Sequence, residues 1–229
     1  MGTTIKLTAA DGHTFDAYRA DPPRTSKGGI VVVQEIFGVN AHMRSVCDFY
    51  ASKGYTAIAP AVFDRAQKKF DVEVSADSIA KGRDLAMSLD SANTLADIRA
   101  AADAVRGPQR GAKVGIVGYC FGGTMAAAAS IHLSDVFASA VAYYGGGVGD
   151  MLGGAQPKIP LLCHFGKKDE YIPLKTIKKI RAAWTTAIVH AYPAEHGFNR
   201  DGSSNYHQAS ARKAQKRSLD FFALTLSQR

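Results

Sequence analysis

The residue with the clearest chemical potential is Cys120, in the stretch GYCFGG between an apolar β-branched run and an alanine-rich run. With Gly118 and Gly122 it has the spacing of the nucleophile elbow G-x-S-x-G, cysteine replacing serine. The turn from strand to helix at an elbow is so sharp that larger neighbouring side chains would collide. The helix N-terminus also favours a thiolate and a developing oxyanion. The pattern predicts a nucleophile, whereas a lone cysteine is usually a small buried hydrophobe.

Two downstream residues could activate this thiol. Asp169 follows the apolar run PLLCHFG, and His196 follows the run AIVHAY. The order nucleophile, acid, histidine is the chain order of α/β-hydrolases. His196 would accept the thiol proton and later deliver it to a leaving group, while Asp169 would fix the imidazole tautomer. Asp169 could also be a turn residue, with Glu170 as a competing acid, and His164 inside a strand is expected to be a core residue.

The elements around these residues alternate between strand and helix. The runs at 3–8 and 14–20, separated by an Asp-Gly turn, predict a β-hairpin. Strands are expected over 29–35, 55–62, 113–119, 136–145, 159–166 and 187–192. Helices are expected over 40–53, 75–88, 93–106 (closed by Gly-Pro at 107–108), 122–133, 173–184 and 205–226. The segment 145–156 is expected to be a flexible loop.

This alternation indicates right-handed βαβ units. We predict an α/β fold with a mostly parallel central sheet, helices on both faces, and an N-terminal antiparallel hairpin. With no internal repeat or long linker, residues 1–229 are expected to form a single domain. In open α/β sheets the ligand site lies outside the carboxyl ends of the strands. Glu35, Cys120, Asp169 and His196 all come at or just after such ends.

The motifs together resemble the dienelactone hydrolase (carboxymethylenebutenolidase) family. They are QEIFGVN at 34–40, GYCFGG at 118–123, YYG at 143–145, the Asp169 loop, and EHGF at 195–198 with Arg200 behind it. The match runs from about residue 30 to 222. The resemblance implies an α/β-hydrolase fold and a Cys120–His196–Asp169 triad without a metal or organic cofactor. It also implies that Glu35 contacts the resting cysteine and takes part in its activation when an anionic substrate binds.

The resemblance also suggests roles for further residues at the site. The backbone N–H groups of Phe121 and Ile36 are expected to form the oxyanion hole. Phe37 and Tyr144 are expected to line the pocket, although large aromatic residues in such places often serve only for packing. The ordinary alternative for Glu35 is a strand-end carboxylate in an ion pair.

Substrate anchoring departs from the family pattern. Members that act on dienelactone hold its carboxylate with two arginines, and Arg200 matches one of them. The position of the other falls near Ile79, in the stretch ADSIAKGRD. Arg83 or Lys81 could replace it from a neighbouring turn of the predicted helix.

Charge is distributed unevenly along the 229 residues. Residues 1–157 hold 15 Lys and Arg against 15 Asp and Glu, whereas residues 158–229 hold 13 against 5. The basic residues fall mainly in LKTIKKIRAAW and ARKAQKRSLDFF, which are typical of amphipathic helices with solvated polar faces. No nucleic-acid-binding module accompanies them, so we expect no nucleic acid partner. The charge could help to attract anionic substrates.

The cysteines and the N-terminus indicate the compartment. Cys47, Cys120 and Cys163 cannot all pair and lack CxxC spacing, which argues against a disulfide framework or a zinc site. The first residues lack a secretory signal pattern, and no apolar run approaches the roughly 18 residues needed to span a bilayer. We therefore expect a cytoplasmic monomer that does not bind membranes.

These observations predict a cysteine hydrolase that opens small anionic lactone or ester bonds through a thioester at Cys120. The resemblance implies dienelactone as the substrate and maleylacetate as the product, within the degradation of aromatic compounds. Two alternatives remain open. One is a general carboxylesterase or thioesterase of the same fold, and the other is a redox-sensing thiol protein that performs no hydrolysis.

Overall fold

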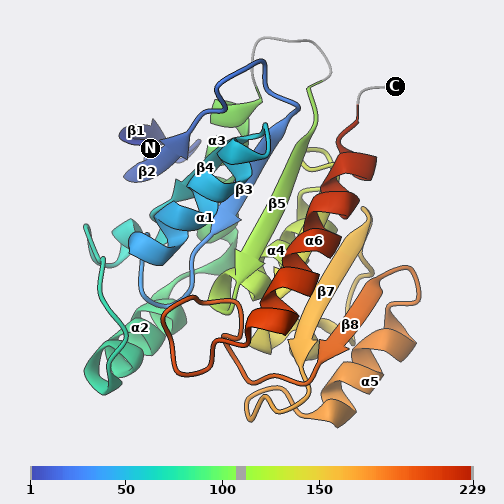
Figure 1. The fold of residues 1–229 in the computed structure, drawn as a ribbon. Coiled ribbons are helices and arrows are strands. Elements are labelled where there is room, and N and C mark those ends of the chain that lie inside the picture. The colour runs from blue at the N-terminus through green and yellow to red at the C-terminus, as the bar shows by residue number, and fades with distance from the viewer. Residues whose placement is uncertain (1, 107–111, 228–229) are drawn as a thin grey trace.

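A twisted eight-stranded sheet forms the centre of the computed structural model, which describes residues 2–106 and 112–227. Its strand order is β1-β2-β4-β3-β5-β6-β7-β8 (Figure 1). The strands are β1 (Thr3–Thr8), β2 (Thr14–Ala20), β3 (Gly29–Val33), β4 (Thr56–Pro60), β5 (Val114–Tyr119), β6 (Ser139–Tyr143), β7 (Leu161–Gly166) and β8 (Ile188–Tyr192).

The strands pair as the sequence predicts. β1 and β2 form an antiparallel hairpin, and β2 pairs antiparallel with β4. From β4 through β8 every neighbouring pair is parallel. Every residue of β3 and β5 is buried, as expected for strands that helices cover on both faces. The mostly parallel sheet with an N-terminal antiparallel hairpin is thereby confirmed.

Helices cover both faces of this sheet. They are α1 (Ala41–Ser52), α3 (Ser91–Val105), α4 (Phe121–His132), α5 (Leu174–Ala183) and α6 (Gln208–Thr225), whereas α2 (Ala76–Ser88) lies beyond the carboxyl ends of the strands (Figure 1). α1 and α6 lie on one face, in front of the sheet in Figure 1, where Tyr50 of α1 meets Phe222 of α6 edge to face. α3, α4 and α5 lie on the other face. α4 packs closely on β5 and β6 because its inner positions are alanines with no exposed surface: Ala126, Ala127 and Ala129.

The helix ends follow local capping chemistry. The Asn40 side chain accepts the N–H of Met43 and begins α1, and Ser75 with Ser78 forms a capping box at α2. α6 begins three residues later than expected because the His207 ring accepts the N–H of Ser210. The segment 145–156, expected to be a loop, contains the 3-10 helix η2 (Gly146–Met151). The Gly-Pro pair at 107–108 lies outside the described residues.

Candidate active site

Cys120 comes directly after β5 and caps α4, with φ 54° and ψ −114°. A non-glycine residue in such a conformation stores about 1–3 kcal/mol of strain, which the surrounding structure must hold. The Cys120 N–H donates to the carbonyl of Tyr143 at 3.0 Å. A Cβ added to Gly118 would collide with the carbonyl oxygen of Gly122, and one added to Gly122 would collide with that of Val33. The elbow therefore requires glycine on both sides of the cysteine.

His196 and Asp169 approach this thiol from the loops after β8 and β7. His196 Nε2 lies 3.2 Å from Cys120 Sγ, and His196 Nδ1 lies 2.8 Å from Asp169 Oδ2. The other carboxylate oxygen of Asp169 accepts the backbone N–H groups of Tyr171 at 2.9 Å and Ile172 at 3.2 Å. The three predicted residues thus form a continuous hydrogen-bonded chain with a carboxylate that the backbone holds in place.

The electrostatics of the hydrogen-bonded series from Cys120 through His196 to Asp169 favour a charged imidazole at His196. Burial alone would lower the pKa of His196, but hydrogen bonds to Asp169 and Cys120 outweigh it and raise that pKa to about 10. The Asp169 side chain has no exposed surface, so its attraction for the imidazolium is poorly screened. A charged imidazole 3.2 Å from Cys120 Sγ is placed to stabilise negative charge that develops on the sulfur.

A second charged group at the same cleft is the ion pair of Glu35 with Arg200, beside which lies the ring of Phe37. Glu35 follows β3 and is 2% exposed, and Arg200 Nη1 lies 3.0 Å from its Oε2. The Arg200 guanidinium carbon stands 5.0 Å from the centroid of the Phe37 ring. The ion pair and the aromatic face together restrict where the guanidinium can point.

These groups line a cleft of about 430 Å³. Its walls are Glu35, Ile36, Phe37, Ile79, Arg83, Cys120, Phe121, Thr124, Gly146, Gly147, Tyr171, His196, Arg200 and Asn205. Neither the N–H of Ile36 nor that of Phe121 donates a hydrogen bond to another described residue. Both donors are therefore available to an oxygen atom bound beside Cys120.

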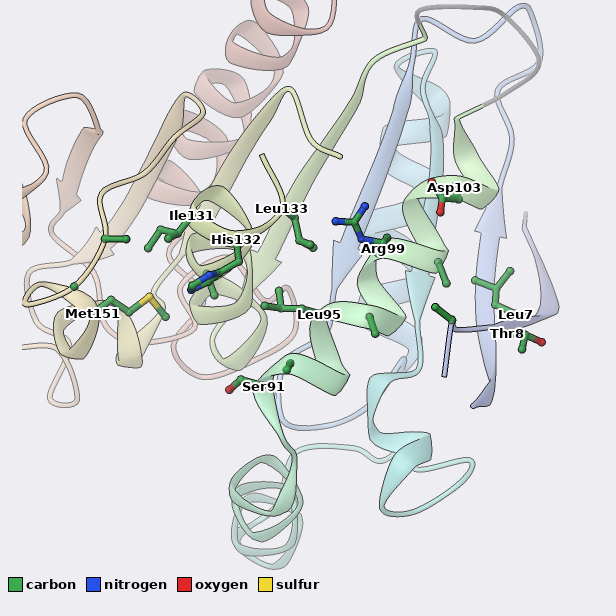
Figure 2. Close-up of a pocket in the computed structure, with 17 residues that line it drawn as sticks. Leu7, Thr8, Ser91, Leu95, Arg99, Asp103, Ile131, His132, Leu133 and Met151 are labelled. Atoms are coloured by element: carbon green, nitrogen blue, oxygen red, sulfur yellow. The ribbon is translucent and has the colours of Figure 1, made fainter. Parts of the chain in front are cut away.

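A larger groove of about 1060 Å³ lies elsewhere, between α3 and α4 (Figure 2). Its walls are mainly apolar, with Leu95 from α3 and Ile131 from α4, and Leu7 of the hairpin at one end. Arg99, also at this groove, pairs with Asp135 at 2.8 Å. None of the residues predicted to do chemistry reaches this groove, so we locate the site at Cys120.

Comparison with known proteins identifies the family of this chain. The family model described as "Dienelactone hydrolase family" matches residues 15–226. The chain belongs to the dienelactone hydrolase family. A carboxymethylenebutenolidase of Pseudomonas putida is 33% identical over 226 residues, which cover 96% of this chain and 95% of that protein. Carboxymethylenebutenolidase 1 of Cupriavidus pinatubonensis is 27% identical and covers 96% of both chains. This member of the family is accordingly a hydrolase of ester or lactone bonds.

Solved structures show the same architecture. The crystal structure named "Putative Dienelactone Hydrolase from Klebsiella pneumoniae" has a TM-score of 0.79 at 30% identity and covers 96% of this chain and 99% of that one. The Pyrococcus furiosus esterase Pf2001 has a TM-score of 0.72 at 13% identity, covering 99% of this chain and 93% of that one, and supports the fold alone. The α/β-hydrolase fold is therefore shown.

Helix α2 forms one wall of the cleft, at the place where a second arginine was sought. Ile79, at the position where a second arginine was sought, lines the cleft, and so does Arg83 one turn later. Lys81 is exposed and does not line the cleft. The Arg83 guanidinium carbon lies 5.2 Å from the centroid of the Tyr171 ring. Of the two candidate replacements, α2 turns only Arg83 toward the cleft.

Two predicted contacts differ in the structure. Tyr144 was expected to line the pocket, but it has no exposed surface and its ring packs 5.1 Å from that of His196, outside the cleft walls. Its φ of 37° after β6 turns the side chain into the core. Glu35 was expected to touch Cys120, but no hydrogen bond joins them: the Glu35 carboxylate pairs with Arg200, and the Cys120 thiol pairs with His196.

Sequence reasoning missed two residues that support the site. Tyr171 is 62% exposed, and its ring centroid lies 5.1 Å from that of His196, edge to face. Asn205 donates from Nδ2 to the carbonyl of His196 at 3.0 Å. Tyr171 is two residues from Asp169, which was a usable signal. Asn205 is nine residues from His196 across an irregular loop, where no periodicity indicates contact.

His164 is the core residue that the sequence predicts. Its ring contacts the hydroxyls of Tyr192 at 2.9 Å and Ser218 at 3.1 Å, and burial lowers its pKa well below the usual value. Among the described residues, no group of three or more His, Cys, Asp and Glu side chains could hold a metal ion. No helix in the described part of the chain is long and apolar enough to cross a membrane.

Proposed function

We propose that this hydrolase opens small anionic lactones or esters by nucleophilic attack of Cys120, through a thioester acyl-enzyme. The observation that carries the proposal is the hydrogen-bonded chain from Cys120 Sγ through His196 to Asp169, at 3.2 and 2.8 Å, on a strained elbow. A buried structural cysteine would require neither the strain nor the aligned imidazole.

The proposed reaction has two stages. His196 holds the thiol proton as the Cys120 sulfur bonds to the carbonyl carbon, and the oxyanion accepts the N–H groups of Ile36 and Phe121. The carbon–oxygen bond to the leaving group then breaks, and His196 delivers its proton to that oxygen. In a lactone the leaving alcohol stays attached to the acyl group. Water next attacks the thioester while His196 takes its proton, and Cys120 leaves as the thiol.

The substrate carboxylate is proposed to bind at Arg200 and Arg83. Arg200 has donors beyond the one that Glu35 occupies, and its side chain is only 13% exposed, so an anion there is weakly screened. Glu35 acts as the group that positions Arg200 and gives up part of that contact when the substrate anion arrives. Phe37 and Tyr171 shield the two guanidinium groups. Dienelactone, with maleylacetate as the product, is the proposed substrate.

Ile79 favours a second candidate, a general carboxylesterase or thioesterase. An isoleucine at this wall supplies apolar contact where a second guanidinium was sought, which suits a neutral acyl group. The two candidates differ in their dependence on a substrate carboxylate, which makes them separable by comparing paired substrates.

The experiment measures hydrolysis of dienelactone and of 4-nitrophenyl acetate by the wild type, Cys120→Ala and Cys120→Ser. Turnover of both substrates should fall by at least about 10³-fold in Cys120→Ala, because the covalent route is lost. Activity that survives in Cys120→Ala contradicts the mechanism. If the acetate ester is turned over but dienelactone is not, the general esterase is the correct assignment.

A further inference from the structure

A cationic groove follows the free edge of the sheet, away from the cleft. It has a volume of about 610 Å³, and we call it the edge groove. It is lined by Lys167, Leu174, Ile177, Lys178, Arg181, Val189, His190, Ala191, Tyr192, Pro193, His207, Ala209, Ser210, Lys213 and Arg217. Five of these are lysine or arginine, two are histidine and none is acidic. The groove accounts for much of the basic excess in the last third of the sequence.

The groove runs along the backbone of β8 rather than over one face of the sheet. β8 is the last strand, pairing with β7 on one side. Side chains of successive strand residues point to opposite faces. A cavity that touches every residue from Val189 to Tyr192 must therefore follow the open edge. Unpaired strand edges of this kind accept an added strand.

The two basic helices reach this edge from opposite faces. α5 packs against β8 and supplies Lys178 and Arg181 (Figure 1). α6 lies on the other face and supplies Lys213 and Arg217. An added strand would also alternate its side chains between the faces, so successive residues would meet α5 and α6 in turn.

The cations of the edge groove lack acidic partners. Its lysines and arginines form no ion pair with any residue that the structure describes, whereas Lys216, outside the groove on α6, pairs with Asp220. Two arginines are held at the edge itself. Arg181 Nη2 donates to the carbonyl of Val189 at 3.1 Å, and Arg217 Nη1 donates to the hydroxyl of Tyr192 at 3.0 Å.

Charge decides which strand could bind. Positive side chains that flank an edge strand disfavour the pairing of two copies of the chain, since each would present cations to the other. The same cations attract a segment of opposite charge. Leu174, 47% exposed, adds an apolar contact on the α5 side.

We propose that the edge groove binds an extended acidic segment of a partner protein, which adds to β8 as a ninth strand. Its acidic side chains would alternate between Lys178 and Arg181 on one face and Lys213 and Arg217 on the other. Arg181 would leave the Val189 carbonyl for a carboxylate of the partner, freeing that carbonyl for the added strand. The proposal concerns surface outside the cleft and does not depend on the reaction at Cys120.

The test uses a fluorescein-labelled peptide of eight residues in which pairs of glutamates alternate with pairs of valines, so that an added strand presents glutamates to both faces. Binding is followed by fluorescence polarisation. A peptide with lysine replacing glutamate should not bind. A peptide of the same sequence that is N-methylated at every residue keeps its charge but loses the donors on both edges, and should bind at least about tenfold more weakly. Equal binding of the methylated peptide would overturn strand addition.

Two variants with equal net charge locate the binding. Lys178→Glu with Lys213→Glu reverses one groove cation on each helix and should weaken binding by at least about fivefold. Lys175→Glu with Lys216→Glu makes the same change on the same helices outside the groove and should leave binding within about twofold. Equal loss in both variants overturns the proposal. Inorganic tripolyphosphate that binds the wild type when the peptide does not would also overturn it, in favour of a phosphate site.

Discussion

Arg200→Met removes the cation that neutralises Glu35 at a position where the carboxylate is 2% exposed. Removing one partner of a buried ion pair costs about 3–5 kcal/mol, because the remaining charge is left without water or a counterion. The Glu35 carboxylate has no other ion-pair partner among the described residues. For a chain of this size a loss of about 3 kcal/mol lowers the melting temperature by about 6–12 °C.

The reverse substitution should be milder. Glu35→Gln leaves Arg200 with a side chain that is 13% exposed and stacked on Phe37, so the guanidinium keeps some access to water. We expect a loss of about 1–2 kcal/mol. The double variant Arg200→Met with Glu35→Gln has no unpaired charge and should be more stable than Arg200→Met alone by about 2 kcal/mol.

Urea unfolding followed by tryptophan fluorescence gives these differences directly, since Trp184 is the single tryptophan and is fully buried. Lys216→Met breaks an ion pair whose side chains are 76% and 62% exposed and should leave the transition unchanged. A loss below about 1 kcal/mol in Arg200→Met would refute the reasoning. So would a double variant whose loss equals the sum of the two single losses.

Three further predictions concern the elbow, the anchor and the histidine. Gly122→Ala should lower the melting temperature by several degrees, because the added Cβ meets backbone carbonyls. The control Gly146→Ala has open space around the added Cβ and should leave the melting temperature unchanged. Equal melting temperatures of the two variants would contradict the steric account. Arg83→Ala should reduce kcat/KM about five- to tenfold for 4-nitrophenyl hydrogen succinate but not for 4-nitrophenyl acetate, and Lys81→Ala should change neither. The folded-state pKa of His196 is raised from 6.5 to about 10, so its stabilisation is complete below pH 6.5 and is lost as pH rises to 10. The melting-temperature difference between wild type and His196→Gln should shrink over that window, and a constant difference would argue against a charged imidazole.

Much of the fold and the centre of the site could be predicted from sequence because the signals are local. Continuous β-branched runs separated by capped helices predict a parallel sheet, and the carboxyl ends of its strands identify one edge as the site. Glycine at 118 and 122 predicts the elbow, because no other residue fits there. The order of Cys120, Asp169 and His196 then predicts their meeting, which the 3.2 and 2.8 Å contacts are consistent with.

Local patterns could not predict where long side chains point. Lys81 and Arg83 are two residues apart on α2, and small differences in helix placement decide which one reaches the cleft. Tyr144 belongs to a motif of the site, yet the backbone turn after β6 sends its ring into the core. Glu35 had two possible partners, and the position of Arg200 after a loop decided between them.

The sequence alone determined the order of the reactive residues along the chain: a cysteine on a glycine-flanked turn, then an acid, then a histidine, each after an apolar strand. Backbone sterics and the geometry of parallel sheets make that outcome independent of distant detail. Tertiary structure alone decided the Glu35–Arg200 pair, the Arg83–Tyr171 contact and the edge groove. These depend on segments far apart in sequence, whose side chains meet only once the sheet and helices have packed.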